Sequence, residues 1–576
     1  MAKRLPPEVE RRRRLITRTV PLAIVAIVAF VVGAAVGAPG SPQKEAANRF
    51  AEAWARNDFK AMYEELNDAS REKVSPGQFA SAYREAEQTA TLTGLQAGSA
   101  GDPESGNGAT LVPVPMAVRT VAFGRFEEQL SLPFADGGVA WDPSLAFPGL
   151  RPGERLEAEI ELAPRAPILA NNGTPLAAGS ADEREHPLGD SMIDVVGEIG
   201  MPSEEELPRL ARRGFGPETP VGISGLEKAL NARLAGTPGG TLKAVSESGS
   251  RTLAQSEPKE GAPVKTTIDP EIQEASVNAL AGRAGGIAVL DARNGDVRAL
   301  AGQAYSAPQP PGSTFKIVTT TAALQKGLVS LDDEFEYTEG VNVGGRFIEN
   351  ANGEICGGTF RQAFAESCNA DFAPLGPQIG NDAFVATAER FGFNSPPTLY
   401  SENLVAALEP AESTIPQEIG SEVDLGVSAI GQGEVQATPL EMASVAQTVA
   451  NDGVREPTSV VKNAKLRPEA EPVRVMSKKI ADELTELMVG VVVEGTGTAG
   501  AITEAQVAGK TGTAELGPKP GTENEENPPQ RKDAWFAAFA PAEKPRLAIG
   551  VLLIEAEAAG GEVAAPAAAE VLSAGL

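Results

Sequence analysis

A serine and a lysine three positions apart, Ser313 and Lys316, have the spacing needed for nucleophilic catalysis. They follow a Pro-Pro-Gly turn and begin an apolar run that continues to Gly327, which predicts a helix opening at Ser313. One helical turn places both side chains on the same face. The positive end of the helix favours an alkoxide on the serine. Burial beside another cation would lower the pKa of the lysine amine and allow it to act as the base.

The Ser-x-x-Lys spacing is not specific by itself, because it occurs five times in the chain. A single occurrence is more often a helix start or a pair on the surface. Only Ser313 follows a Pro-Pro-Gly turn and opens a largely uncharged helix suited to burial. The context therefore selects one of the five. The five occurrences start at Ser41, Ser70, Ser256, Ser313 and Ser459.

Two further motifs follow along the chain. Ser367 begins a Ser-x-Asn pattern that ends at Asn369; this pattern occurs four times and carries little weight alone. Lys510 begins the one Lys-Thr-Gly sequence, within a strand-like run. A phosphate-binding loop is the alternative meaning of Gly-Lys-Thr, but that loop requires a glycine where this chain has Glu504. The phosphate-binding alternative is therefore rejected.

The composition excludes several kinds of site. The chain has one histidine, His186, and two cysteines. A Ser-His-Asp triad would have to use that histidine, and a His-rich or four-thiolate metal site cannot form. We expect the base of any hydrolase or acyltransferase here to be Lys, Asp or Glu. A formal net charge of −28 repels nucleic acid. The sequence predicts no metal, no cofactor and no nucleic-acid partner.

An uncharged run at residues 20–38 predicts a membrane anchor. A helix of this length spans about 28 Å, close to the hydrocarbon thickness of a bilayer. Seven basic residues among residues 1–19 predict a cytoplasmic tail, a single pass through the cell membrane and an extracytoplasmic catalytic part. A buried core helix and a cleaved signal peptide are the alternatives. Because Pro39 hinders cleavage, we expect the anchor to be retained.

Residues 41–150 are predicted to form a small α+β domain. Apolar side chains at helical spacing predict an amphipathic helix over 48–66 and a second helix over 78–88. Strand-like runs follow at 110–120 and 121–132. The aromatic residues of this region are expected in its core.

Residues 151–265 are rich in Gly, Pro and charge and show few long periodic segments, so we expect a linker or pedestal. A further domain is expected over 266–576. It opens with Asp269-Pro270, a good N-cap and first helical residue, and this helix should end near Ala281. Strands on either side of Asn294-Gly295 predict a hairpin with a type I′ turn.

The three motifs, in their order along the chain, resemble those of penicillin-binding proteins and serine β-lactamases. Residues 430–440 resemble the turn and helix start of the transpeptidase domains in this family, and residues 533–541 resemble the strand paired with Lys-Thr-Gly. Residues 41–150 resemble the NTF2-like domain found before some transpeptidases. The chain is similar to a class B, monofunctional penicillin-binding protein. This implies an α+β transpeptidase domain, with helices flanking an antiparallel sheet, and a dimerisation-type pedestal at 151–265.

The resemblance implies a role for the residues of the first two motifs. Ser313 would attack the carbonyl of a D-Ala-D-Ala stem peptide of peptidoglycan, and Lys316 would be the base. Ser367 would relay the proton to the leaving D-Ala. Asn369 would hold the substrate amide and help to orient the lysine. A β-lactam would acylate the same serine.

The third motif is implied to bind the substrate. Lys510 would supply positive potential, and Thr511 and Thr513 would bind the terminal carboxylate. Gly512 would let the substrate backbone lie close to the strand. The backbone N–H groups of Ser313 and Thr513 would form the oxyanion hole, which is worth about 3–4 kcal/mol of barrier in comparable sites.

Other activities stay open. A D,D-carboxypeptidase or a β-lactamase could use the same site, and a non-catalytic β-lactam sensor or scaffold is a third alternative. A class A β-lactamase would need a glutamate before Lys-Thr-Gly, for which Glu418 and Glu422 are weak candidates. The motifs of a glycosyltransferase are not recognised, so the expected partners are a separate glycosyltransferase and proteins of division or elongation.

Two segments near the motifs carry separate expectations. Cys356 and Cys368 are expected to form a disulfide that closes a short loop ending in the Ser-x-Asn motif; two buried thiols are the alternative. The loop at 517–532 has no apolar residue other than proline, so we expect it to be mobile and to overhang the active site. An inert, solvated insertion is the alternative for this loop.

Replacing Ser313 with alanine should abolish covalent labelling by a fluorescent penicillin, because the nucleophile is lost. Labelling should persist when the serines of the other four Ser-x-x-Lys occurrences are replaced. Fluorescence of the protein band on a denaturing gel reports both results. Undiminished labelling of the Ser313→Ala protein would contradict the assigned nucleophile.

Overall fold

The computed structural model describes residues 41–106, 109–518, 520–521 and 530–576. The chain forms two compact units. The first unit contains the described residues up to 161, together with 211–214 and 239–257. The second unit contains 162–210, 215–238 and 258–576.

Two of the predicted segments fall on residues that are not described. The predicted tail and anchor, residues 1–38, lie outside the described ranges. Within those ranges, no helix is both long enough and apolar enough to cross a bilayer. Most of the expected loop at 517–532 is also outside them, and its described ends, Pro518 and Gln530, are paired as the ends of two strands.

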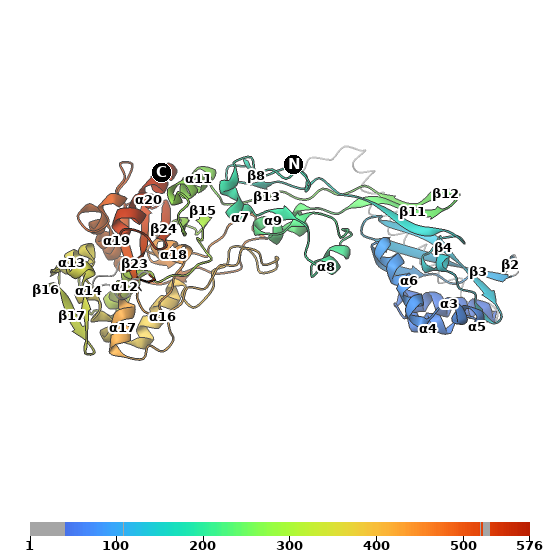
Figure 1. Ribbon diagram of the computed structural model, residues 1–576, viewed down its shortest axis with the longest axis horizontal. Coiled ribbons are helices and arrows are strands. Elements are labelled where there is room, and N and C mark those ends of the chain that lie inside the picture. Colours follow the sequence, from blue (N-terminus) through green and yellow to red (C-terminus); the bar gives the residue numbers. More distant parts are fainter. Residues whose placement is uncertain (1–40, 107–108, 519, 522–529) are drawn as a thin grey trace, which may run out of the picture. The chain divides into compact units, whose positions relative to one another are not determined.

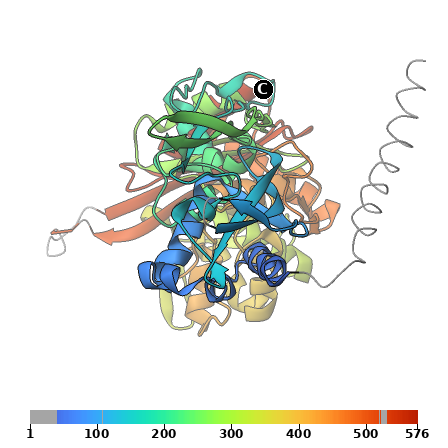
Figure 2. The same ribbon diagram turned by 90° about the vertical axis from the view of Figure 1, so that its right-hand side faces the viewer.

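The first unit packs helices against an antiparallel sheet (Figure 1; Figure 2). Helices α3 (Pro42–Ala55) and α6 (Pro76–Thr89) each follow a serine whose side chain caps the first turn. The long strands β3 (Ala109–Thr120) and β4 (Arg125–Ala135) pair along their length. Both layers contribute buried side chains to one core, including Phe50, Trp54, Phe79, Tyr83, Val114 and Leu132. The smaller elements are α4 (Phe59–Glu64), α5 (Asp68–Lys73), β1 (Leu92–Ala97), β2 (Glu104–Gly106) and β5 (Gly138–Val139).

The helix predicted over 48–66 is wrong in extent, because the chain breaks it into α3 and α4. Asn57 adopts a left-handed conformation with φ of 56°, which ends the first helix. The side chain of Asp58 then accepts a hydrogen bond of 3.0 Å from the N–H of Ala61 and caps the next helix. The apolar spacing continues across the break because both helices bury one face. The spacing of apolar residues alone therefore does not reveal the break between the two helices.

The other elements predicted in this unit are confirmed within a few residues. The helix predicted over 78–88 is α6, and the two predicted strands are β3 and β4. The second strand begins later than predicted because residues 121–124 form a turn that ends at Gly124, with φ of 76°.

The stretch 151–265 is divided between the two units. Strands β6 (Arg155–Glu161), β11 (Gly239–Ser246) and β12 (Gly249–Ser256) form a regular antiparallel sheet in the first unit. Residues 162–210 and 215–238 belong to the second unit, and there two arginines hold one buried carboxylate. Its oxygens accept hydrogen bonds of 2.7 Å and 2.8 Å from the Nε atoms. The residues of this ion cluster are Arg165, Arg184 and Glu227.

The second unit is built on a five-stranded antiparallel sheet with the order β15-β14-β24-β23-β22. The strands are β14 (Gly285–Asp291), β15 (Val297–Gly302), β22 (Ala508–Pro518), β23 (Gln530–Ala540) and β24 (Leu547–Leu553). Successive side chains of a strand face opposite sides. On β23, Phe536 packs with helices α11 (Pro270–Leu280) and α20 (Gly560–Gly575). Its neighbours Trp535 and Ala537 pack with helices α18 (Pro439–Ala450) and α19 (Lys478–Val493) on the other face. The sheet is thus covered by helices on both faces (Figure 1).

The elements predicted around this sheet are mostly confirmed. Asp269 caps α11, with Pro270 as its first residue, and α18 begins at the predicted Thr-Pro. The predicted hairpin forms between β14 and β15, but the prediction of a type I′ turn is wrong. A type I′ turn needs positive φ at both central residues. Within the connecting residues 292–296, all of which are described, only Gly295 has positive φ.

Close packing of α18 on the sheet depends on Gly550 of β24. A Cβ atom at this position would lie 2.1 Å from the carbonyl oxygen of Pro439 in the first turn of the helix. Gly490 of α19 is the opposite case, because no atom beyond its chain neighbours and the backbone of its own helix lies within 4 Å of where its Cβ would be.

Replacing Gly550 with alanine should lower the free energy of unfolding by roughly 1–3 kcal/mol, because the methyl group pushes α18 away from the sheet. Replacing Gly490 with alanine is the matched control. It should raise the free energy of unfolding by about 0.5–1 kcal/mol, since alanine favours a helix interior. Urea unfolding followed by circular dichroism measures both. Equal effects of the two replacements on the free energy of unfolding would show that the contact between Gly550 and the first turn of α18 is not tight.

Candidate active site

Ser313 and Lys316 lie where a short 3₁₀ turn runs into a buried helix. The turn η4 (Gly312–Phe315) contains Ser313, and α12 (Lys316–Lys326) begins with the lysine. The helix ends at Gly327 in a left-handed conformation, as the sequence predicts. The structure differs from the predicted helix only in that the first turn, which contains Ser313, is a 3₁₀ turn. Ser313 is half-buried, whereas the lysine is fully buried.

Two glycines let the Lys-Thr-Gly strand contact the Ser313 turn directly. A Cβ on Gly512 of β22 would lie 2.6 Å from the carbonyl oxygen of Pro311, and a Cβ on Gly312 would lie 2.7 Å from the carbonyl oxygen of Thr513. The backbones of the first and third motifs therefore touch. Gly512 was expected to make room for a substrate, and the structure shows that it also makes room for the protein's own turn.

The amine of Lys316 points at the Ser-x-Asn motif. Its Nζ donates to the carbonyl oxygen of Ser367 at 2.7 Å, to Oδ1 of Asn369 at 2.9 Å and to Oγ of Ser367 at 3.2 Å. The ring of Phe372 lies 5.0 Å from the same atom. The hydroxyl of Ser313 has no hydrogen-bond partner within the described residues. Catalytic hydrogen bonds are often long in proteins without substrate, so this arrangement is compatible with the lysine as the base.

The amine of Lys510 approaches the same hydroxyl from the strand. Its Nζ donates to Oγ of Ser367 at 2.8 Å and to the carbonyl oxygen of Thr511 at 3.2 Å. The ring of Phe364 lies 5.6 Å away. The structure thus brings all three motifs together, with Oγ of Ser367 between the two lysine amines.

Burial changes the protonation of both lysines. Burial and the nearby Lys510 lower the pKa of Lys316 well below its usual value, against the opposing effect of Asp371. Burial lowers the pKa of Lys510 to about 7. Two amines that share one hydroxyl oppose each other's protonation. The lowered pKa of Lys316 favours the neutral amine, which is the form that a general base requires.

The Ser-x-Asn motif is held in a strained conformation. Helix α13 (Phe360–Glu366) ends at Ser367, which has a left-handed backbone with φ of 66°. A residue with a side chain rarely adopts this conformation, and such strain is often found at functional sites. It turns the carbonyl oxygen and the hydroxyl of one residue toward the same lysine. Helix α14 (Asn369–Phe372) then follows directly.

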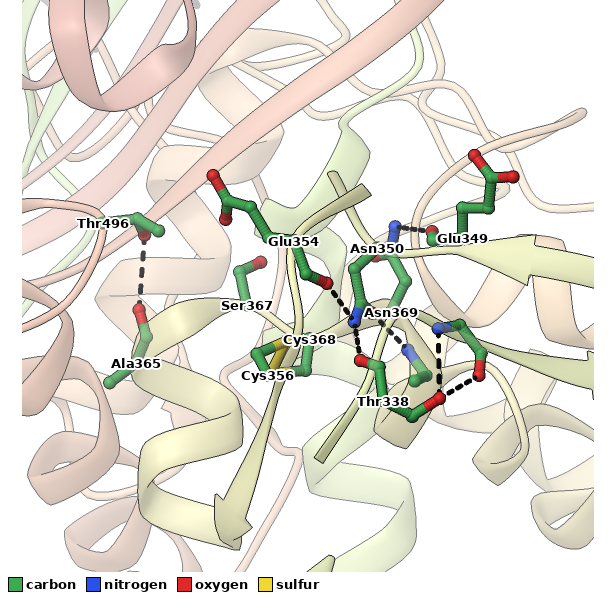
Figure 3. Close-up of a disulfide and its surroundings, with 12 residues drawn as sticks. Thr338, Glu349, Asn350, Glu354, Cys356, Ala365, Ser367, Cys368, Asn369 and Thr496 are labelled. Atoms are coloured by element: carbon green, nitrogen blue, oxygen red, sulfur yellow. Dashed lines mark hydrogen bonds between the residues drawn. A yellow bond between two sulfur atoms is a disulfide. The ribbon is translucent and has the colours of Figure 1, made fainter. Parts of the chain in front are cut away.

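The predicted disulfide between Cys356 and Cys368 is present, with 5.9 Å between the Cα atoms. It ties strand β19 (Cys356–Thr359) to the motif (Figure 3). Asn350 supports the other side: its Oδ1 accepts a hydrogen bond of 2.9 Å from the N–H of Ala370. Nδ2 of Asn369 donates at 2.9 Å to the carbonyl oxygen of Glu349. The motif is therefore fixed by tethers at the three residues that follow Ser367.

The third motif is held by Thr496 and Gly560, which the sequence did not indicate, and by Gln432 of the 430–440 segment. Oγ1 of Thr511 lies 2.6 Å from Oγ1 of Thr496, and Oγ1 of Thr513 accepts a hydrogen bond of 3.3 Å from the N–H of Gly560. Nε2 of Gln432 donates at 3.4 Å to the carbonyl oxygen of Thr513. No spacing pattern links these positions, so only the fold brings them together.

Asp371 is a buried charged neighbour of the site that no motif marks. It is 7% exposed, and burial raises its pKa to about 6, against the opposing effect of Lys316. It lies two positions after the Ser-x-Asn motif, but nothing in the sequence distinguishes it from a surface aspartate. Glu418 and Glu422, the weak β-lactamase candidates, are exposed, and no hydrogen bond or ion pair among the described residues joins them to the site.

The match to known families agrees with this geometry. The family model described as the penicillin-binding protein transpeptidase domain matches residues 285–573, half of the chain. The chain belongs to this family. The penicillin-binding protein dimerisation domain matches residues 176–266, and the NTF2-like N-terminal transpeptidase domain matches residues 42–154. The resemblance predicted from the motifs is confirmed.

Two similar relatives in this family come from mycobacteria. The peptidoglycan D,D-transpeptidase PbpA of Mycolicibacterium smegmatis is 37% identical over 298 residues, which cover 48% of this chain and 57% of that protein. PbpA of Mycobacterium tuberculosis is 37% identical over 296 residues, with the same two shares. The chain thus spans a little over half the length of these relatives.

Solved penicillin-binding proteins share the fold. The D,D-transpeptidase domain of a peptidoglycan glycosyltransferase from Eggerthella lenta has a TM-score of 0.56 and 31% identity, and the match covers 72% of this chain and 98% of that one. Penicillin-binding protein A of M. tuberculosis, solved as a penicillin G acyl-enzyme complex, has a TM-score of 0.56 and 28% identity, over 72% of this chain and 99% of that one.

Replacing Lys316 with arginine should slow acylation by penicillin at least roughly a hundredfold, because arginine keeps the charge but cannot give up its proton. Lys326→Arg is the matched control at the exposed end of the same helix, where Nζ donates to the carbonyl oxygen of Ile379. It should acylate at the wild-type rate. Stopped-flow measurement with a fluorescent penicillin gives both rates. A Lys316→Arg rate within a few-fold of wild type would place the base elsewhere.

Proposed function

We propose that this chain is a peptidoglycan D,D-transpeptidase that crosslinks stem peptides through an acyl-enzyme on Ser313. The observation that carries the proposal is the position of the Ser367 hydroxyl, which lies 2.8 Å from the amine of Lys510 and 3.2 Å from the amine of Lys316. Such an arrangement can move a proton between a nucleophile and a leaving group without histidine.

Acylation starts with attack of Oγ of Ser313 on the carbonyl carbon between the two D-Ala residues of a stem peptide. The neutral amine of Lys316 takes the hydroxyl proton. The backbone N–H groups of Ser313 and Thr513 stabilise the negative oxygen of the tetrahedral intermediate. The intermediate collapses when the hydroxyl of Ser367 passes a proton to the leaving nitrogen and takes one in return from the ammonium of Lys316. The terminal D-Ala departs, and the amine of Lys316 is neutral again. The peptide is then an ester of Ser313.

Deacylation repeats the same steps with an amine as the nucleophile. The amine of a second stem peptide attacks the ester, and the base takes its proton. Collapse returns the proton to the serine and leaves an amide crosslink. Water in place of the amine would give a carboxypeptidase, so the outcome depends on which acceptor reaches the ester.

Recognition of the substrate is proposed to rest on the third motif. The hydroxyl groups of Thr511 and Thr513 bind the terminal carboxylate, and Lys510 supplies positive potential. The contact of β22 with the Ser313 turn supports this role, because it keeps the carboxylate-binding threonines beside the nucleophile. A β-lactam carries a comparable carboxylate and amide. Acylation by penicillin is supported by the penicillin G acyl-enzyme complex of the structural relative from M. tuberculosis.

We further propose that residues 20–38 anchor the chain in the cell membrane, with residues 1–19 in the cytoplasm and the catalytic unit outside. The uncharged run behind a basic segment supports this orientation. A transpeptidase needs glycan strands, so a separate glycosyltransferase and division or elongation proteins are the proposed partners.

The test is to supply the purified full-length chain with a stem-peptide donor and a D-amino acid or second stem peptide as the acceptor. Mass spectrometry should find the aminolysis product in excess of the hydrolysis product, and the Ser313→Ala protein should give neither. Hydrolysis alone would assign a carboxypeptidase instead. Absence of both products, together with normal penicillin labelling, would favour a β-lactam sensor.

A further inference from the structure

A surface cavity lies in the second unit, and none of the proposed site residues lines it. It has a volume of about 550 Å³. The loop after α12, the start of β16 (Glu334–Thr338) and helices α14 and α15 (Leu375–Ile379) line it, and it is open to solvent. Its apolar walls are formed by Leu328, Val329, Phe335 and Leu375.

The polar lining of this cavity is acidic. Three carboxylates line it, those of Asp333, Glu334 and Asp371, and its lining includes no lysine, arginine or histidine. Asp333 and Glu334 are exposed at its rim. Both carboxylate oxygens of Asp333 already accept hydrogen bonds from Ser330, at 2.8 Å and 2.6 Å. Asp333 therefore contributes charge at the rim and keeps about one free acceptor site on each oxygen.

Asp371 is the group that lacks a partner. It is 7% exposed, and its Oδ2 has no hydrogen-bond partner among the described residues. A buried carboxylate oxygen without a donor is costly. Oδ2 itself is shielded from solvent, so a positively charged donor in the cavity would reach this carboxylate through the small exposed part of the residue.

A metal ion does not fit this lining. Among the described residues, the three carboxylates are not close enough to one another to share an ion, and hard cations need several oxygen ligands at about 2.0–2.6 Å. An organic ammonium group needs only one carboxylate and leaves its carbon chain against the apolar walls.

We propose that this cavity binds a primary ammonium group carried on an apolar body, with the ammonium donating to Asp371. The carboxylates at the rim attract the cation, and the four apolar side chains hold its carbon skeleton. Asp371 also acts electrostatically on Lys316, so the cavity borders a group that influences the proposed base. The inference concerns binding alone and stands whether or not the transpeptidase assignment is correct.

The test uses the Ser313→Ala protein, so that chemistry at the proposed nucleophile cannot contribute. Titration with 2-phenylethylammonium, followed by isothermal calorimetry and ligand-observed NMR, should give saturable binding. The neutral isostere 2-phenylethanol should bind at least roughly tenfold more weakly, because it lacks the charge-assisted hydrogen bond. Equal affinities for the two probes would overturn the proposal.

Three further replacements locate the site. Asp371→Asn should weaken ammonium binding at least roughly tenfold, and Gln378→Trp should abolish it, because the exposed Gln378 lines the cavity and a large ring there obstructs it. Asp332→Asn is the matched control. It removes the same charge from a neighbouring position that does not line the cavity and is paired with Arg361. It should change the affinity less than twofold.

Two outcomes would contradict the assignment. Equal weakening by Asp371→Asn and Asp332→Asn would show only general attraction to negative charge. Saturable binding of calcium, lost in Asp371→Asn, without any binding of the ammonium probe would assign a metal site instead. If Asp371→Asn fails to fold, unchanged binding to the Gln378→Trp protein would still overturn the proposal.

Discussion

The amines of Lys316 and Lys510 approach one hydroxyl, Oγ of Ser367, from two different elements in the interior of the second unit. Two full positive charges on amines that contact the same hydroxyl in a buried site would repel each other strongly. Both lysines are fully buried, so desolvation also favours their neutral forms. Burial therefore lowers the pKa of both amines and opposes the presence of two fixed charges.

The rest of the fold keeps these three side chains in place. Gly312 and Gly512 allow β22 to touch the turn that carries Ser313. The strained backbone of Ser367 is secured by a disulfide at the next residue and by Asn350 beyond it. Aromatic rings lie beside both amines. They exclude water and offer a weakly favourable face to whichever amine carries the proton.

Local patterns in the sequence were enough to predict much of this arrangement. The helix after the Pro-Pro-Gly turn and the helix start at Asp269-Pro270 depend on nearby residues, and both are confirmed. The strand paired with Lys510 was predicted from the family resemblance and is also confirmed. The break at Asn57 was missed because the apolar spacing on both sides stays in phase. The turn at Gly295 was misread because its connection is longer than two residues.

Contacts between distant segments could not be predicted in the same way. Thr496, Gln432 and Gly560 contact the third motif only because of the fold. Asp371 was visible beside the second motif, but its importance comes from burial, which no spacing reports. The sequence therefore predicted the residues of the candidate site, while the structure was needed to find the residues that contact and support them.

The most direct test is an NMR titration that measures the pKa of the lysine side chains, labelled with ¹³C at Cε. The Lys316→Arg and Lys510→Arg proteins assign the two signals. We expect the pKa of Lys316 to lie well below the usual lysine value of 10.5 and the pKa of Lys510 to lie near 7. If both lysines remain protonated up to about pH 10, the usual range for lysine, then Lys316 cannot serve as the base near neutral pH and the central claim fails.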